Sequence, residues 1–128
     1  MTGVYAANWE PIFHFTVDPD PLNGSGGEQL GVWNIPASNR EFSHETGDHP
    51  APFPVALVDK AIRTSTDEGD TILDPFMGSG TTAVASVESG RSYIGFELDE
   101  EGAYKPIIER RIGEAKRQRD AEVNAADD

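Results

Sequence analysis

Residues 71–82, Thr-Ile-Leu-Asp-Pro-Phe-Met-Gly-Ser-Gly-Thr-Thr, decide the fold of this chain. The apolar and β-branched start is typical of a buried strand, and the proline ends that strand because it has no N–H to donate to a ladder. Gly78 and Gly80 predict a sharp turn in which a ligand can approach the backbone without meeting a Cβ. Ser79 and Thr81 are candidate caps for the helix that follows. The stretch therefore predicts a strand, a tight turn and a helix in direct succession.

A second strand signal follows that helix. Residues 92–96, Ser-Tyr-Ile-Gly-Phe, lead into Glu97, which lies 23 positions after Asp74. A glycine-rich turn after one strand and a carboxylate after the next, roughly 20 residues on, is the arrangement that holds a nucleoside in a doubly wound fold. An ordinary strand-to-helix turn is the alternative. The spacing favours the nucleoside site, with Glu97 accepting hydrogen bonds from the ribose hydroxyls.

The composition of the turn restricts the nucleoside. The turn matches neither GxGxxG nor GxxxxGK[ST], so it has no phosphate cradle and no phosphate-binding lysine. S-Adenosylmethionine carries no phosphate, and its sulfonium cation suits Asp74 and the turned backbone carbonyls. A nicotinamide cofactor is the alternative.

Three pieces of the chain resemble the amino-directed DNA methyltransferases, which methylate N6 of adenine or N4 of cytosine. Residues 74–82 resemble that family's cofactor motif, residues 49–57 (His-Pro-Ala-Pro-Phe-Pro-Val-Ala-Leu) its helix-opening cofactor motif, and residues 90–99 its second strand. Their order is that of the permuted branch, in which the catalytic half comes first. The resemblance implies an α/β fold, namely a partial, three-layer, Rossmann-like S-adenosylmethionine-dependent methyltransferase fold that lacks the central catalytic strands.

The resemblance also implies roles for single residues. Asp74 is expected to face the methionine end of the cofactor, Phe76 to pack near the adenosine, and Glu97 to bind the ribose hydroxyls. Phe53 and its neighbouring prolines are expected to line the methionine side. The turn shapes the pocket through backbone and hydroxyl groups of Gly78, Ser79, Gly80 and Thr81.

Methylation of an exocyclic amine needs a further element, because the amine lone pair is delocalised into the ring. The family uses an Asp/Ser/Asn-Pro-Pro-aromatic loop that accepts hydrogen bonds from the amine and stacks on the flipped base. This sequence contains no Pro-Pro pair. We therefore expect no catalytic residue in this chain, no turnover by the chain alone, and a complementary methyltransferase chain that supplies the catalytic half. A non-catalytic remnant or regulatory cofactor-binding module is one alternative, and an RNA, protein or small-molecule methyltransferase is another.

The net charge is unusual for a protein whose expected partner is DNA. The 128 residues include 23 acidic and 10 basic ones, a net charge of −13, and only three of the basic residues are lysines. Proteins that bind DNA normally present a basic surface to its phosphates. Either that surface lies on another chain, or the protein is halophilic, since salt shortens the range of charge repulsion. A mildly acidic surface without special meaning is the third interpretation.

Several classes of protein are disfavoured. The absence of cysteine excludes disulfides and thiolate metal sites, and His44 and His49 have no fixed carboxylate spacing, so we expect no metal site. With no run of 18 apolar residues and no signal-peptide pattern, we expect a cytoplasmic protein without a membrane partner.

The remaining segments complete the predicted organisation. Alternation over residues 12–17 predicts a strand, Pro54 begins a helix that ends near Thr64, and Gly90 ends the helix after the turn in a left-handed cap. A further helix begins at Tyr104, with an apolar stripe of Tyr104, Ile107, Ile108, Ile112 and Ala115. Arg110 and Arg111 on this helix are expected to be solvated, with contact to a DNA backbone as the alternative.

Residues 1–116 form the predicted partial methyltransferase domain, which is loop-rich over 18–48. Residues 117–128 form a predicted disordered acidic tail.

Overall fold

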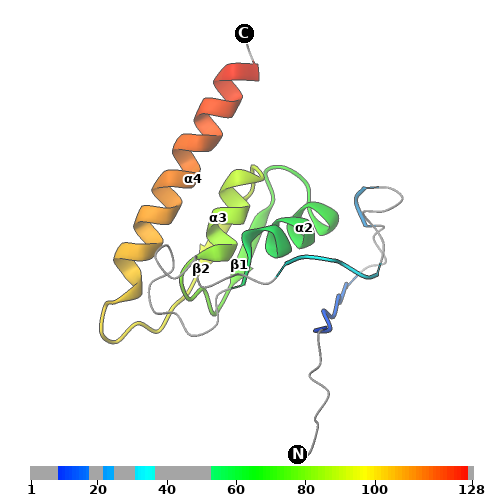
Figure 1. Ribbon diagram of the computed structural model, residues 1–128, viewed down its shortest axis with the longest axis horizontal. Helices are drawn as coiled ribbons and strands as arrows, with labels where there is room; N and C mark the ends of the chain where they lie inside the picture. Colours follow the sequence, from blue (N-terminus) through cyan, green and yellow to red (C-terminus); the bar gives the residue numbers. More distant parts are fainter. Residues whose placement is uncertain (1–8, 18–21, 25–30, 37–52, 127–128) are drawn as a thin grey trace, which may run out of the picture.

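The computed structural model describes residues 9–17, 22–24, 31–36 and 53–126. The order of elements is α2 (Val55–Ser65), β1 (Thr71–Asp74), α3 (Thr81–Glu88), β2 (Ser92–Gly95) and α4 (Tyr104–Ala126) (Figure 1). The predicted succession of strand, turn, helix and second strand is confirmed, and so is the helix that Pro54 begins. Helices therefore alternate with strands, as in an α/β protein.

The two strands pair in parallel. Thr71 lies opposite Ser92, and Asp74 lies opposite Gly95. Parallel neighbours need a crossover connection, which α3 provides. Because parallel strands end at the same edge of a sheet, the turn after β1 and the residues after β2 come together there.

Helix α3 is the centre of the fold. It lies between α4 and α2 (Figure 1), and its small residues Ala83 and Ala85 are 1% and 0% exposed. Ile62 of α2 and Ile112 of α4 are buried as well. The short side chains of α3 let its neighbours approach closely.

Only one face of the sheet is covered by the described residues. Side chains along both strands alternate in exposure. Ile72 and Tyr93 are partly buried on the face that α3 covers, whereas Leu73, Ile94 and Phe96 are 62%, 51% and 61% exposed. Parallel sheets normally have both faces covered, and on this face the described residues supply no second layer over these large apolar side chains.

Helix α4 is longer than the sequence indicated. It continues to Ala126, so residues 117–126 are helical where a disordered tail was predicted. Arg119 holds this part of the helix against the body, since its guanidinium lies 3.4 Å from the Glu88 carbonyl oxygen and 3.3 Å from a Glu68 carboxylate oxygen. The last two residues of the predicted tail lie outside the described residues.

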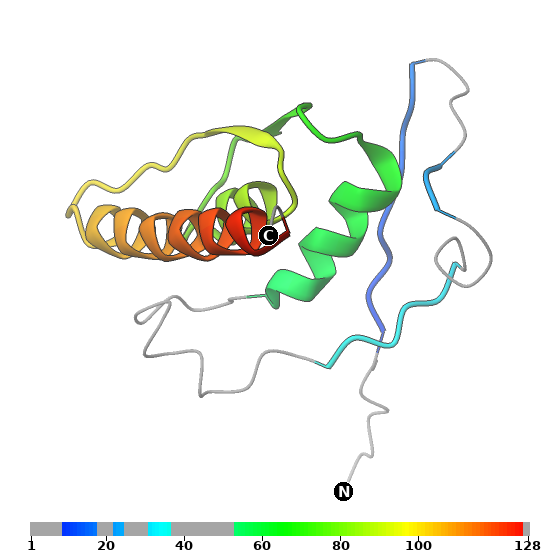
Figure 2. The same ribbon diagram turned by 90° about the horizontal axis from the view of Figure 1, so that it is seen from above.

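The N-terminal segment differs from its prediction. Residues 9–17 are exposed and form no strand with any described residue, although the rings of Phe13 and Phe15 stack at 6.3 Å. They lie on the side of α2 that faces away from α4 (Figure 2). Alternation specified a strand-like pattern, but a strand also needs a partner, and none of the described segments supplies one.

Candidate cofactor site

The turn after β1 is built from two glycines in the left-handed region. Gly78 and Gly80 have φ angles of 52° and 86°, and the Gly80 N–H donates to the Met77 carbonyl oxygen at 2.9 Å. Gly80 is the N-cap of α3, and no side chain caps that helix. The prediction that Ser79 or Thr81 caps it is therefore wrong, because a glycine in this conformation enters the helix directly.

The glycine at position 80 makes room for α4. A Cβ added to Gly80 would lie 3.4 Å from the Ile108 side chain. The backbone at Gly80 is thus approached closely by a helix of the same chain, whereas the sequence suggested approach by a ligand. The turn residues 78–81 are buried.

The hydroxyls of the turn face a buried arginine. Arg111 Nη1 of α4 donates to the Ser79 carbonyl oxygen at 2.7 Å, and lies 3.1 Å from Ser79 Oγ and 3.3 Å from Thr81 Oγ1. Arg111 is only 6% exposed, so the prediction that it is solvated is wrong. A signal was available, because position 111 lies three residues after Ile108 and four before Ala115, on the apolar stripe of this helix.

Asp74 and Glu97, the two predicted cofactor-binding acids, lie at the ends of neighbouring strands. Glu97 Oε2 accepts a hydrogen bond from the Gly78 N–H at 2.6 Å, and Asp74 Oδ1 accepts one from the Phe76 N–H at 2.9 Å. Backbone bonds from Phe96 N–H to the Asp74 carbonyl oxygen (3.0 Å) and from Met77 N–H to the Phe96 carbonyl oxygen (2.8 Å) join the two strand ends. The turn, Asp74 and Glu97 therefore form one cluster.

The two predicted aromatic residues are placed differently. Phe76 lies two residues after Asp74 and is 87% exposed, so its ring lies largely in solvent beside the cluster. Phe53 is 46% exposed and precedes Pro54, the N-cap of α2. Residues 49–52 of the helix-opening motif lie outside the described residues.

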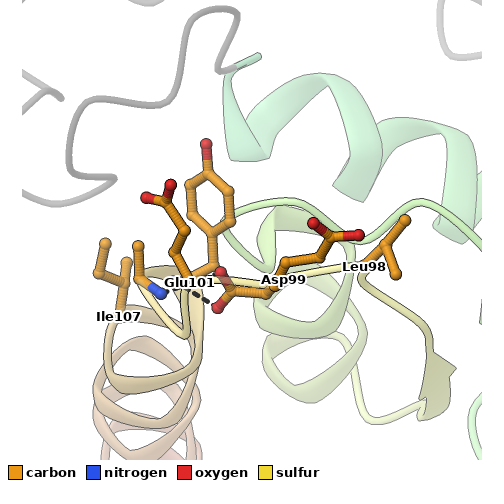
Figure 3. Close-up of a pocket in the computed structure, with 7 residues that line it drawn as sticks. Leu98, Asp99, Glu101 and Ile107 are labelled. Carbon is orange, nitrogen blue, oxygen red and sulfur yellow. Dashed lines mark hydrogen bonds between the residues drawn. The ribbon is translucent and has the colours of Figure 1, made fainter.

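A cavity of about 410 Å³ lies at the start of α4 (Figure 3). Its lining consists of Leu98, Asp99, Glu100, Glu101, Ala103, Tyr104 and Ile107, which includes none of the predicted cofactor residues. The Asp99 carboxylate accepts the N–H groups of Ala103, Tyr104 and Lys105 at 2.9, 2.7 and 3.1 Å. This carboxylate caps α4, the helix that carries Arg111.

The Asp99 cap also changes the acidity of that residue. Desolvation acts to raise the pKa of Asp99, but the backbone N–H groups at the start of α4 together outweigh it and lower the pKa below its usual value. Amides that donate to a carboxylate favour its ionised form.

Two negative observations concern the described residues alone. Within residues 9–17, 22–24, 31–36 and 53–126, no three His, Asp or Glu side chains are grouped so that they could hold a metal ion. In the same part of the chain, no helix has the length and apolar character needed to cross a membrane.

Comparison with known proteins identifies the family. A family model described as DNA methylase, of the N6/N4 methyltransferase type, matches residues 5–110. The chain belongs to this family. Among its relatives, the type II methyltransferase M.BglI of Bacillus subtilis is 46% identical over 69 residues, which cover 54% of this chain and 18% of that protein. M2.MboI of Moraxella bovis is 42% identical over 78 residues, covering 61% of this chain and 28% of the relative. The chain thus spans less than a third of the length of these two relatives.

A solved methyltransferase structure has the same fold. The complex of M1.HpyAVI with SAM matches with a TM-score of 0.56 and 32% identity, over 72% of this chain and 43% of that one. The prediction of an α/β, partial Rossmann-like methyltransferase fold is confirmed.

Proposed function

We propose that the chain is the S-adenosylmethionine-binding portion of a site-specific DNA methyltransferase that methylates an exocyclic amino group, cytosine N4 or adenine N6. Membership of the DNA methylase family supports the reaction class. The observation that carries the proposal is the meeting of the glycine turn and Glu97 at the carboxyl ends of two parallel strands, where Glu97 Oε2 lies 2.6 Å from the Gly78 nitrogen. Ligands of open α/β sheets bind at this edge.

The residues present fit the cofactor. A carboxylate has about four lone-pair positions, so Glu97 can keep its bond to Gly78 and still accept two ribose hydroxyls. Asp74 supplies negative charge beside the turn, which suits a sulfonium. S-Adenosylmethionine, when bound, supplies the electrophilic methyl group. The residues of this chain hold and orient that cofactor.

We further propose that a second polypeptide carries the catalytic loop and covers the bare face of the β1–β2 sheet. The sequence contains no Pro-Pro pair. Leu73, Ile94 and Phe96 together expose an apolar surface on the face opposite α3. Each is already about half covered, so its full burial contributes about 1 kcal/mol, or roughly 3 kcal/mol for the three. This free energy would help to hold the two chains of a split enzyme together.

A non-catalytic, cofactor-binding module is the second candidate function. The missing Pro-Pro pair favours it equally, because this candidate needs no catalytic half. We also propose that the protein works in a high-salt cytoplasm, on the basis of its net charge of −13.

Reconstitution tests the main proposal. The chain is co-purified with the polypeptide encoded beside it, and transfer of a labelled methyl group from S-adenosylmethionine to DNA is measured. Ile94→Asp on the bare face is expected to abolish transfer while leaving cofactor binding intact. Val123→Asp is the matched control, because Val123 is similarly exposed, at 46% against 51%, but lies near the end of α4.

The outcomes separate the candidates. Cofactor binding without methyl transfer by the reconstituted pair favours the non-catalytic module. Absence of any S-adenosylmethionine binding contradicts both candidates.

A further inference from the structure

We propose that Arg111 is a positioning residue that sets the conformation of the cofactor turn from outside it. This inference rests on the proposed cofactor role of the turn. Arg111 comes from α4, lies 30 residues further along the chain than Thr81, and belongs to none of the motifs that mark the site.

The 2.7 Å contact of Arg111 acts on one peptide of the turn, Ser79–Gly80. The Ser79 carbonyl oxygen accepts from Arg111 Nη1 at 2.7 Å, while the N–H at the other end of the same peptide, that of Gly80, donates to the Met77 carbonyl oxygen at 2.9 Å. Two bonds pulling on opposite ends of one peptide fix its rotation. The Met77 carbonyl belongs to the Met77–Gly78 peptide, whose other end, the Gly78 N–H, donates to Glu97 at 2.6 Å. The orientation of the Ser79–Gly80 peptide therefore affects the direction of the amide that pairs with the ribose-binding acid.

The burial of Arg111 explains why these contacts are strong. Its exposed fraction is 6%, and those of Ser79 and Thr81 are 4% each. A buried charge is costly unless hydrogen bonds satisfy it, and hydrogen bonds to charged groups are stronger than neutral ones. The turn offers the guanidinium one carbonyl and two hydroxyl oxygens within 3.3 Å. A side chain that served packing alone would be apolar, as Ile108 and Ile112 are.

Helix α4 is itself held in register with the turn. Asp99 caps its first residues, and Ile108 lies against Gly80, one turn of helix before Arg111. The cap, the isoleucine and the arginine thus form a continuous connection from the residues after Glu97 back to the turn. Figure 1 shows α4 running alongside α3, the helix that the turn begins.

The test compares Arg111→Met and Arg111→Lys with Arg119→Met. Arg119 is the matched control, because it lies on the same helix and contacts Glu68 and Glu88 instead of the turn. Lysine keeps the charge but lacks the planar fork of donors. Two quantities are measured in the full chain: backbone amide hydrogen exchange over residues 76–82 without cofactor, and the Kd for S-adenosylmethionine by calorimetry.

We expect Arg111→Met to speed exchange in the turn at least about tenfold and to raise the Kd about tenfold, a shift near 1.4 kcal/mol. Exchange in β1 and β2 stays unchanged. Arg111→Lys gives smaller changes of the same kind, and Arg119→Met gives neither.

Unchanged exchange in the turn of a folded Arg111→Met chain overturns the proposal, and so does faster exchange with an unchanged Kd. If the methionine variant does not fold, the lysine variant decides by the same two measurements. If the wild-type chain itself binds no cofactor, the proposed function fails, while the exchange of residues 76–82 still decides whether Arg111 positions the turn.

Discussion

Replacing Glu97 with alanine is expected to weaken S-adenosylmethionine binding roughly 10- to 100-fold. Hydrogen bonds to charged groups contribute about 1.5–3 kcal/mol, and 1.4 kcal/mol is a factor of ten in Kd. The bond from Gly78 to Glu97 is internal to the protein, at 2.6 Å, so its loss lowers stability in the free and bound states alike. The change in Kd therefore reports the bonds to the ribose.

Glu97→Gln separates these two contributions. Its amide oxygen can still accept from the Gly78 N–H, so we expect a melting temperature close to that of the wild type. The negative charge is lost, and we expect Kd to rise only about fivefold, between the wild type and Glu97→Ala.

Calorimetry at 25 °C with S-adenosylmethionine and its 3′-deoxy analogue measures the effect. Wild type should bind the analogue more weakly than the parent cofactor, whereas Glu97→Ala should no longer distinguish them. Glu100→Ala is the control, since Glu100 is a nearby exposed acid. The ribose assignment is refuted if Glu97→Ala binds within twofold of wild type, or if Glu100→Ala loses as much affinity.

Three further substitutions test the structure around the site. Gly80→Ala places a side chain at φ 86° and 3.4 Å from Ile108, and should lower the free energy of unfolding in urea by about 1–2 kcal/mol. Gly102→Ala, at φ 70° in open space, is the control and should lower it less. An equal loss in both variants would show that the contact with Ile108 is irrelevant. Burial, and after it two neighbouring carboxylates, raises the pKa of Glu88, so ionisation of Glu88 destabilises the fold as pH rises through the folded pKa. Glu88→Gln should therefore raise Tm at pH 7 but not near pH 4. An unchanged Tm at pH 7 would contradict this. The lowered pKa of Asp99 gives stability that is present above its unfolded pKa of about 3.9 and is lost as pH falls through the folded value. Asp99→Asn should lower Tm at pH 7, and its difference from wild type should vanish near pH 2. A difference that stays constant with pH would point to another cause.

The parts of the fold that sequence predicted are those with local signals. The proline after Asp74, the paired glycines and the small residues of α3 act on their immediate neighbours, and β1 and α3 follow from them. Gly90 was expected to end α3 in a left-handed conformation and has φ 78°. The spacing of Asp74 and Glu97 was also informative, because parallel strands bring their carboxyl ends together.

The parts that sequence missed depend on distant contacts. Residue type alone suggested that Arg111 is solvated, but the Ser79 carbonyl and two hydroxyls of the turn make its burial favourable. The end of α4 was taken for a tail, and it is held by Arg119 against Glu68, 51 positions away. The pattern over residues 12–17 indicated a strand but carried no information on its partner.

The bare sheet face has a consequence for how copies of this protein behave towards each other. Leu73, Ile94 and Phe96 offer a surface on which a second copy can stack, and the net charge of −13 on each molecule opposes that approach. Electrostatic repulsion reaches about 10 Å in 0.1 M salt and only about 3 Å in 1 M salt. Isolated chains should therefore stay monomeric in dilute buffer and associate in concentrated salt. The high salt that suits an acidic surface is thus also the condition in which this apolar face most needs to be covered by a partner.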